Sequence, residues 1–372
     1  MRKKISVHKL TVLLFVCSLG VISITNMFSK YETISWNENR TLAEKPKLTL
    51  SSLTSGRFDD QFESWFSDHF FQRDHWIELH AFLRKMCGAI ENNGVYFAAH
   101  DRLVRQFQTV DSANLQANID VIRAFSQAAD IKANILLIPG AVWGAASDLP
   151  HGAADINQTQ LLKSIGKQLA DQNFINFTEL SSPSSSLYFK TDHHWNEKGA
   201  YQGYVSIASQ VLKKIPNRFI YTKKSADFQG TMCSRSGAFW GAKDSIYEIQ
   251  PETGKIDVQV TYDTDSTVYD SLYAPVHLSE KDQYMYYLDG NHAYVHIKTS
   301  TPNDKKAIIV KDSYAHILIP FLAGEYSEIQ LVDLRYYHAA VSQLLDDKAH
   351  TDFYILYNLD NFCADPNLAF LR

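Results

Sequence analysis

The chain has 372 residues, of which 45% are hydrophobic and 21% charged, as expected for a folded globular protein with one large domain or two small ones. Its formal net charge is −5, and no cluster of basic residues lies beyond the extreme N-terminus. Because nucleic-acid binding requires a cationic surface, the composition argues against a nucleic-acid partner.

The first 28 residues predict a segment that inserts into a membrane. An apolar run of about 18 residues extends from Leu10 to about Phe28, at the short end of the range for a membrane-spanning helix. Basic residues precede or begin it: Arg2, Lys3, Lys4 and Lys9. By the positive-inside rule we expect an uncleaved signal-anchor, single-pass in the cell membrane, with the body of the chain outside. A cleaved signal peptide, which would give a secreted protein, is the alternative.

The next two segments differ in pattern. Residues 29–55 are polar, contain Pro46 and predict an extended stalk. From residue 56 to residue 85 aromatic side chains such as Phe58, Phe62 and Phe66 recur at helical spacing and indicate one or two amphipathic helices. We expect one large domain over residues 56–372.

Beyond residue 112, short apolar strands alternate with helices. The expected strands are 133–139, 174–177, 307–310, 329–332 and 353–357, and the expected helices are 112–129, 158–171, 196–214, 315–322 and 338–345. Short, largely apolar strands that alternate with helices predict a parallel sheet covered on both faces, and therefore an α/β fold. Between about 216 and 301 apolar and polar residues alternate instead. This segment predicts antiparallel strands inserted into the α/β body, suited to a lid or substrate wall.

Two motifs carry reactive side chains. The sequence Tyr188-Phe189-Lys190-Thr191-Asp192-His193-His194-Trp195-Asn196 places Asp192 and His194 on a turn that enters a helix. The sequence Ile308-Ile309-Val310-Lys311-Asp312-Ser313-Tyr314-Ala315-His316 places Ser313 between a buried strand and a helix. Together they supply a nucleophile, a base and an orienting carboxylate for serine acyl transfer. The start of the second helix offers N–H groups for an oxyanion.

Each of these residues has a simpler alternative role. Asp192, Asp312 or Ser313 could only cap the helix that follows, because Asp and Ser are favoured caps. Asp192, His193 and His194 could bind a metal ion, although adjacent histidines rarely ligate one ion well, and we expect no metal. His316 is a second candidate base, but its position one helical turn after Ser313 points its ring away from the hydroxyl.

Further residues near the same sheet edge are candidates for binding substrate or the oxyanion. Arg335 follows a strand and could hold negative charge, or only pair with Asp333. Asn358 and Asn291 could donate a side-chain N–H to the oxyanion, or only form turns. Aromatic side chains beside the two motifs are candidates for contact with substrate: Trp195 and Tyr314.

At these residues the chain resembles the DHHW protein family, whose name spells Asp192-His193-His194-Trp195. The likeness includes further blocks: Glu38-Asn39-Arg40 with Pro46, Asp68 and Arg73, Asn93-Gly94-Val95-Tyr96, Phe228-Gln229-Gly230-Thr231, Lys311-Asp312-Ser313-Tyr314-Ala315 and Asp333-Leu334-Arg335-Tyr336-Tyr337. The family looks like a relative of the alginate O-acetylation proteins, which have an SGNH-hydrolase-like (flavodoxin-like) domain with Asp-x-His ahead of the serine. The order of Asp192, His194 and Ser313 is similarly permuted.

The resemblance implies a serine-dependent O-acetyltransferase outside the membrane, with residues 56–372 as the catalytic domain. Arg335 looks like the active-site arginine of those relatives. The implied acceptor is a polysaccharide, and the implied partner is a membrane-bound O-acyltransferase that supplies acetyl groups. No acetyl-CoA motif is present, so we expect no cofactor. An acetyl esterase with the same triad and a non-catalytic polysaccharide-binding module are the alternatives. One residue departs from the pattern, because Lys311 stands where Gly usually opens the Gly-Asp-Ser block.

Overall fold

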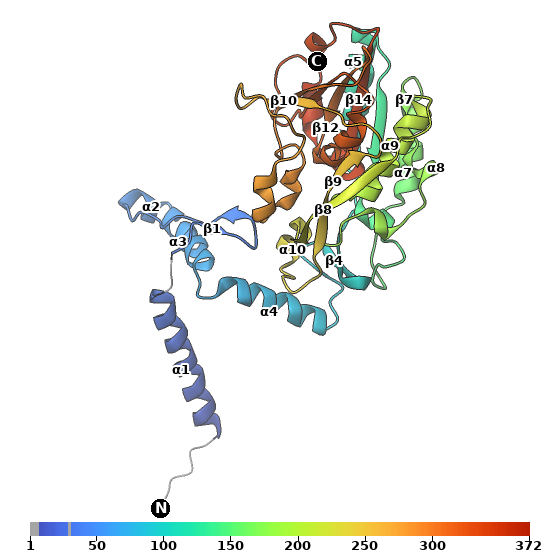
Figure 1. Cartoon of the computed structure of the whole chain (residues 1–372). Helices are drawn as coiled ribbons and strands as arrows, with labels where there is room; N and C mark the ends of the chain where they lie inside the picture. The colour runs from blue at the N-terminus through green and yellow to red at the C-terminus, as the bar shows by residue number, and fades with distance from the viewer. Residues whose placement is uncertain (1–6, 29–30) are drawn as a thin grey trace, which may run out of the picture. The chain divides into compact units, whose positions relative to one another are not determined.

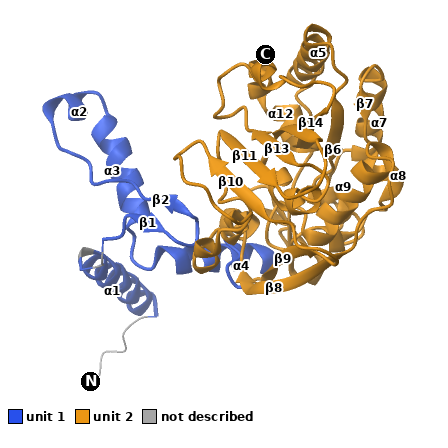
Figure 2. Ribbon diagram, turned by 45° about the horizontal axis from the view of Figure 1, so that its top comes forward, with its two compact units in different colours: residues 1–87, 237–240 blue, residues 88–236, 241–372 orange. Residues whose placement is uncertain are grey.

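The computed structural model describes residues 7–28 and 31–372. Arg2, Lys3 and Lys4, on which the predicted membrane orientation depends, and the first two residues of the predicted stalk lie outside the described residues. The chain divides into two compact units, which Figure 2 distinguishes by colour. The first comprises residues up to 87 together with 237–240, and the second comprises 88–236 with 241–372.

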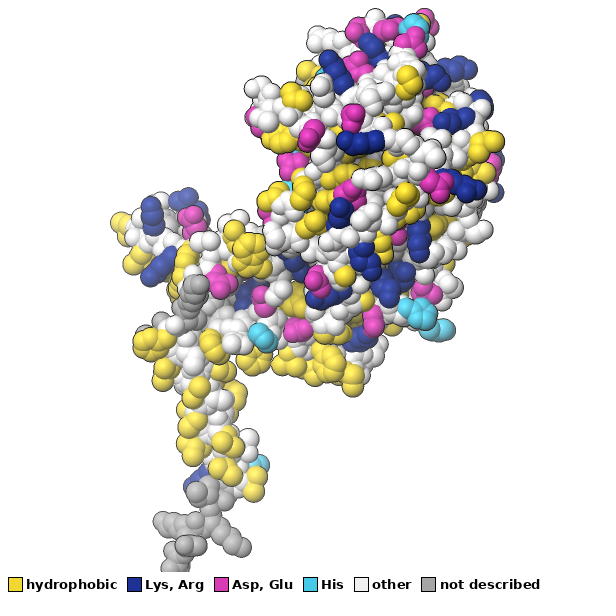
Figure 3. Space-filling view, viewed as in Figure 1, with side chains coloured by type: hydrophobic (Ala, Val, Ile, Leu, Met, Phe, Trp, Pro, Cys, Tyr) yellow, Lys and Arg dark blue, Asp and Glu magenta, His cyan; other side chains and the backbone are white. Residues whose placement is uncertain are grey.

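The first unit begins with the apolar helix α1 (Val7–Met27), drawn in dark blue in Figure 1. Residues Val7–Asn26 have a mean hydropathy of 2.0, and 21 residues of helix span about 31 Å at 1.5 Å per residue. In Figure 3 hydrophobic side chains lie along its whole length. It is the one helix in the described part of the chain that is long and apolar enough to cross a membrane, as an anchor or as a signal.

Five short elements follow α1 in the same unit: β1 (Ile34–Ser35), β2 (Arg40–Thr41), α2 (Leu50–Thr54), α3 (Arg57–Asp68) and α4 (Arg73–Met86). The amphipathic helices predicted for residues 56–85 are therefore α3 and α4. The segment predicted as an extended stalk contains the β1–β2 hairpin and α2. Ion pairs connect this hairpin to α3 and α4. Arg40 Nη2 lies 2.5 Å from Asp68 Oδ1, and Arg73 Nη1 lies 2.7 Å from Glu38 Oε2.

The second unit contains a seven-stranded sheet in the order β10-β11-β13-β12-β14-β6-β7. Its strands are β6 (Asn134–Ile138), β7 (Asn173–Phe174), β10 (Val258–Tyr262), β11 (Tyr294–Thr299), β12 (Lys306–Lys311), β13 (Glu328–Val332) and β14 (Thr351–Asn358). The five strands from β13 to β7 are parallel. Every residue of β6 and all but the first of β12 are buried. Because successive side chains point to opposite faces, this burial means that both faces are covered. The predicted α/β fold is confirmed.

The segment predicted as an insertion extends this sheet. Its strands β10 and β11 pair antiparallel, and β11 adds antiparallel to β13, in the register Ile297 to Ile329. The rest of the insertion forms an antiparallel pair, β8 (Phe219–Phe228) and β9 (Asp244–Pro251), and the 3₁₀ turns η3 (Pro275–Ser279) and η4 (Gln283–Tyr286). A separate antiparallel sheet has the strands β3 (Glu91–Asn92), β4 (Val95–Ala98) and β5 (Arg102–Arg105).

Helices connect the strands, and four of them lie close to the positions predicted at residues 112–129, 158–171, 196–214 and 315–322. They are α5 (Ser112–Ala129), α6 (Ala141–Gly144), α7 (Gln158–Gln168), α8 (Phe177–Leu180), α9 (Glu197–Gln210), α10 (Thr231–Ser236), α11 (Ile319–Leu322) and α12 (Leu359–Ala364). The remaining 3₁₀ segments are η1 (Ala99–Asp101), η2 (Ser185–Leu187), η5 (Ser313–Leu318), η6 (Val341–Leu344) and η7 (Pro366–Phe370). The helix expected at 338–345 is therefore only the single turn η6, because Ser342, Gln343 and the two Asp residues beyond them break the apolar pattern that helix packing requires.

Candidate active site

Strands β12 and β14 are neighbours, and their carboxyl ends lie at the same edge of the sheet. Asp312 follows β12 and caps η5, because its Oδ1 accepts the backbone N–H of Tyr314 at 2.9 Å. Its Oδ2 accepts the backbone N–H of Asn358, at the end of β14, also at 2.9 Å. Burial raises the pKa of Asp312. The side chain thus fixes the turn that presents Ser313 at the sheet edge, where open α/β folds bind ligands.

The turn before Ser313 is formed without glycine. Lys311 is the last residue of β12 and is not in the left-handed region, so its side chain causes no backbone strain. The side chain is 1% exposed, and burial lowers the pKa of its ammonium group. Its Nζ lies 2.8 Å from His316 Nε2 and 3.3 Å from Asp333 Oδ2. His316 is therefore engaged with Lys311 and not with the Ser313 hydroxyl.

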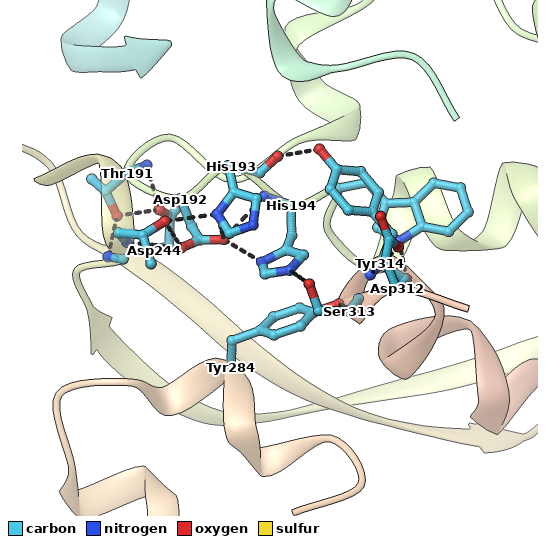
Figure 4. A network of polar contacts seen from close by, with 12 residues as sticks. Thr191, Asp192, His193, His194, Asp244, Tyr284, Asp312, Ser313 and Tyr314 are labelled. Carbon is cyan, nitrogen blue, oxygen red and sulfur yellow. Dashed lines mark hydrogen bonds and ion pairs between the residues drawn. The ribbon is translucent and has the colours of Figure 1, made fainter. Parts of the chain in front are cut away.

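The Asp-x-His turn brings its two side chains together and directs them at Ser313 (Figure 4). Asp192 Oδ1 accepts the backbone N–H of His194 at 3.0 Å and lies 2.5 Å from His194 Nδ1. On the other side of the ring, Nε2 lies 2.8 Å from Ser313 Oγ. Carboxylate, imidazole and hydroxyl thus form one hydrogen-bonded row, with the geometry that general-base activation of a serine requires.

Asp192 is held ionised by its surroundings. Its Oδ2 accepts the backbone N–H and the hydroxyl of Thr231, each at 2.8 Å. Burial alone would raise the pKa of Asp192, but electrostatic interactions with the His193 and His194 side chains and the hydrogen bonds to the carboxylate outweigh it. The net effect places the pKa of Asp192 far below its ordinary value, so the group stays a carboxylate.

His193 lies beside the row, with its ring centroid 3.8 Å from that of His194, and it supports the turn. Its Nδ1 lies 2.7 Å from the Thr231 hydroxyl, and its backbone carbonyl accepts the hydroxyl of Tyr314. Burial lowers the pKa of His193 to about 3, which keeps its ring neutral. Ligating atoms of Asp192, His193 and His194 lie within 4.8 Å of one another. In this arrangement the Nδ1 atoms of both rings already have hydrogen-bond partners, so a metal ion would have to displace them.

A further layer of support comes from residues that sequence reasoning missed. Asp244 accepts the backbone N–H and the hydroxyl of Thr191 at 2.8 and 2.7 Å, and the backbone N–H of Lys190 at 2.8 Å. The Thr191 hydroxyl in turn accepts the N–H of Gly230 at 3.0 Å. Asp244 thereby joins the Asp-x-His turn to the segment that holds Thr231. No local sequence pattern could have identified this long-range partner.

Tyr284, in η4 of the inserted segment, is the other residue that was missed. Its ring stacks on the His194 imidazole with centroids 3.8 Å apart and planes 7° from parallel. Its hydroxyl donates to the backbone carbonyl of Ser313 at 2.9 Å. Figure 4 shows the ring lying against the imidazole.

The predicted aromatic contacts, Trp195 and Tyr314, lie in the interior. They are 0% and 1% exposed, and the Trp195 indole N–H donates to the Tyr314 carbonyl at 2.8 Å. They therefore pack the start of α9 against η5, and neither presents an open surface to a substrate.

The other candidates have structural partners. Arg335 forms a paired contact with Asp333, with Nε on Oδ1 at 2.8 Å and Nη2 on Oδ2 at 2.6 Å. Its Nη2 also donates to Asn291 Oδ1 at 3.1 Å. The Asn358 amide donates to the carbonyl of Ile138 at 3.1 Å, and its oxygen caps α12. The oxyanion roles of Asn358 and Asn291 therefore stay predictions, as does substrate binding by Arg335.

The structure therefore defines the general class of the protein: an α/β fold whose parallel strands carry a hydrogen-bonded Ser-His-Asp row at their carboxyl edge. The model of the DHHW protein family matches residues 161–332, a region that contains both motifs. The match confirms the resemblance to this family that is seen in the sequence. No curated protein matches the sequence.

Solved structures share the fold. A DHHW family protein from Eubacterium siraeum DSM 15702 has a TM-score of 0.63 and 18% identity, covering 76% of this chain and 96% of that one. Bacillus cereus PatB1, solved with a sulfonyl adduct, has a TM-score of 0.60 and 21% identity, covering 73% and 96%. A weaker likeness extends to the O-acetyltransferase domain of Pseudomonas putida AlgJ, with a TM-score of 0.47 and 11% identity, covering 75% and 95%.

Proposed function

We propose that this protein is a membrane-anchored, extracytoplasmic O-acetyltransferase that modifies a polysaccharide through an acetyl-Ser313 intermediate. The observation that carries the proposal is the row of hydrogen bonds from Asp192 through His194 to Ser313. A binding module would have no need of such a row. The sulfonyl adduct of PatB1, a protein with the same fold, adds support, because adducts of this kind form on activated nucleophiles.

The reaction has two stages. Ser313 Oγ attacks the carbonyl carbon of the acetyl donor while His194 Nε2 takes the hydroxyl proton. The bond from carbonyl carbon to leaving group then breaks, and the leaving group receives that proton from His194. In the second stage a sugar hydroxyl attacks the acetyl-enzyme, His194 takes its proton, and Ser313 Oγ is released and protonated. Asp192 stabilises the imidazolium in both stages.

The oxyanion of each tetrahedral intermediate would be held at the start of η5. Ser313 is the first residue of a helical segment that continues through α11 to residue 322. N–H groups in a first helical turn lack intrahelical partners and carry the positive end of the helix dipole. Since the N–H of Tyr314 is bound to Asp312, the backbone N–H of Ser313 is the donor we assign.

The donor and acceptor follow from the resemblance to the alginate O-acetylation proteins. A membrane-bound O-acyltransferase would pass acetyl groups across the membrane, where acetyl-CoA is not supplied, and α1 would keep this protein beside it. A cell-surface or secreted polysaccharide would supply the acceptor hydroxyl. Both partners are part of the proposal.

The test is mass spectrometry of the full chain in detergent after incubation with p-nitrophenyl acetate. We expect an acetyl group on the peptide that contains Ser313, absent in Ser313→Ala and strongly reduced in His194→Ala. His316→Ala serves as the matched histidine control and should still form the adduct. An unmodified Ser313 with no release of acetate would contradict the proposal.

Candidate oligosaccharides then separate the two enzymatic readings. If the acetyl group appears on the sugar, the protein is a transferase. If the acetyl group is released only as acetate, and the sugar does not change the rate of release, the protein is an esterase with the same triad.

A further inference from the structure

We infer that Tyr284 is a positioning residue of this site, which holds the His194 imidazole in line with Ser313 and stabilises the imidazolium that forms during proton transfer. The inference rests on the proposed function and deepens it. It also gives the inserted segment a part in the chemistry, beyond the lid or wall that its sequence predicted.

The geometry joins Tyr284 to both reacting groups. Its ring lies parallel to the imidazole, at a centroid separation of 3.8 Å and an angle of 7°. Its hydroxyl donates to the Ser313 carbonyl at 2.9 Å. Since Asp192 fixes only the edge of the ring at Nδ1, the imidazole could still tilt about that hydrogen bond. A parallel aromatic face removes this tilt and keeps Nε2 on the hydroxyl.

The stacked face also favours the charged form of the base. Tyr284 is buried, and burial raises the pKa of its phenol well above the ordinary value, so the ring is neutral throughout the working range. The face of a neutral aromatic ring attracts a cation more strongly than a neutral imidazole. Stacking therefore stabilises the imidazolium relative to the resting state, in the part of the site where water is excluded.

The position of Tyr284 is fixed by other tyrosines of the insertion. The Tyr287 hydroxyl donates to the Tyr247 carbonyl at 2.8 Å, and the Tyr286 hydroxyl donates to Glu248 at 2.9 Å. Tyr273 stacks on Tyr286 at 4.9 Å. These contacts tie η4 to β9, so the aromatic face over His194 is anchored on a strand and does not depend on the turn alone.

Several titratable groups surround the imidazole and affect its pH response. They come from every element packed around it: Asp192 and His193 from its own turn, Tyr314 and His316 from η5, and Asp282 and Tyr284 from the insertion. Substitutions at Tyr284 leave the other five in place, so a change in pH response between Tyr284 variants reports on the stacked ring.

The test compares Tyr284→Leu, which removes the aromatic face, with Tyr284→Phe, which keeps the face and removes only the hydroxyl. The rate of acetylation of Ser313 is measured against pH in the full chain. We expect Tyr284→Leu to slow acylation about 3- to 30-fold and to move the acid limb of the profile to lower pH by about 0.5 to 1 unit. Tyr284→Phe should keep the acid limb of the pH profile at its wild-type position and should slow acylation by only about 2- to 5-fold. Tyr269→Leu, at an exposed tyrosine of the same insertion, is the control and should match wild type.

A measurement that needs no catalysis separates this inference from the proposed function. In wild type the Tyr284 ring current should shield the ring proton between the two nitrogens of His194. In Tyr284→Leu the NMR signal of this proton should move downfield, and its titration should shift to lower pH. If Tyr284→Leu keeps the wild-type signal and titration, the inference is wrong even where Ser313 is acetylated. If those shifts occur but Ser313 is never acetylated, the stacking is supported and the acyltransferase proposal fails.

Discussion

Gly230 lies directly against the carboxylate of Asp192. A Cβ atom at Gly230 would come within 2.3 Å of the Asp192 Cβ and 2.4 Å of its Oδ2, distances that real structures do not tolerate. Asp192 cannot yield easily, because its two oxygens are already bound to His194 and Thr231. The absence of a side chain at residue 230 is therefore a requirement of the Asp-His pair.

The first prediction follows from this contact. Gly230→Ala should displace the Asp192 carboxylate and tilt His194 away from Ser313, so acetylation by p-nitrophenyl acetate should fall about 100-fold, as expected for a misplacement near 1 Å. Gly324→Ala is the matched control, because its new methyl group would meet only Ile256 at 3.9 Å. A Gly230→Ala protein that melts like wild type and keeps wild-type activity would contradict this account.

A second prediction concerns metal ions at Asp192, His193 and His194. The Nδ1 atoms of both rings already bind Thr231 and Asp192, and the proposed mechanism uses His194 as a general base that needs no metal, so acylation should persist within about twofold after treatment with a chelator. Added Zn²⁺ should inhibit reversibly by competing for the same atoms. Loss of activity on chelation, with recovery on adding Zn²⁺, would instead favour the metal alternative.

How far the site could be predicted depends on how local its signals are. Asp192 and His194 are two residues apart on one turn, and Ser313 lies at a strand-helix junction, so both motifs are visible in the sequence. Their meeting follows from general topology, because parallel strands end at one sheet edge. Tyr284 and Asp244 act across long separations, from an inserted segment with no fixed place in the α/β pattern, so no periodicity could reveal them.

In the fold, too, the elements with a local sequence pattern were predicted and those held by long-range contacts were not. Strands such as β6 and β12 were predicted because residues 135–138 and 307–310 are all apolar, which is the pattern of a strand buried on two faces. The hairpin at residues 34–41 was not predicted, because its two-residue strands are held by ion pairs with α3 and α4 and not by an apolar pattern. The resemblance to the related proteins leads one to expect glycine at position 311. The structure accommodates Lys311 instead, because its side chain pairs with Asp333 and His316.

A third prediction tests this buried lysine. Lys311→Met should lower the free energy of unfolding by about 2 kcal/mol, because His316 Nε2 loses its donor and Asp333 keeps only Arg335. The loss should appear in denaturant unfolding of the full chain in detergent. Lys306→Met is the matched control on the same strand. Its Nζ lies 3.8 Å from Glu328 and is partly exposed, so the change should be below about 0.5 kcal/mol. Equal effects of the two substitutions would contradict the role assigned to Lys311.

A fourth prediction concerns α1. The full chain should stay with the membrane fraction after alkaline carbonate washing, whereas a chain lacking residues 1–28 should be released. The N-terminal sequence of the mature protein distinguishes an anchor from a signal: an anchor retains residues 7–27, and a signal peptidase removes them. Release of the full-length, uncleaved chain by carbonate would show that α1 does not span the bilayer.

The last prediction concerns the ion pairs of the first unit. The hydrogen bond from Arg40 to Asp68 and the nearby charges hold the pKa of Asp68 at about 2, below its ordinary value near 4. A group with a depressed folded pKa stabilises above its unfolded pKa, and its contribution is lost as pH falls through the folded pKa. Asp68→Asn should therefore weaken this unit by about 1–2 kcal/mol at pH 7, after allowing for the exposure of Arg40.

This difference should stay constant above about pH 5 and shrink as the pH falls from about 4 to 2. Hydrogen exchange at the backbone N–H of Ala43, which donates to Asp68 at 2.8 Å, reports on the unit without requiring global unfolding. Asp59→Asn, at an exposed position of α3, is the control and should leave exchange unchanged. If Asp68→Asn loses the same protection at pH 3 and at pH 7, the packing of the residue 68 side chain, and not the charge of Asp68, holds the hairpin to the helices.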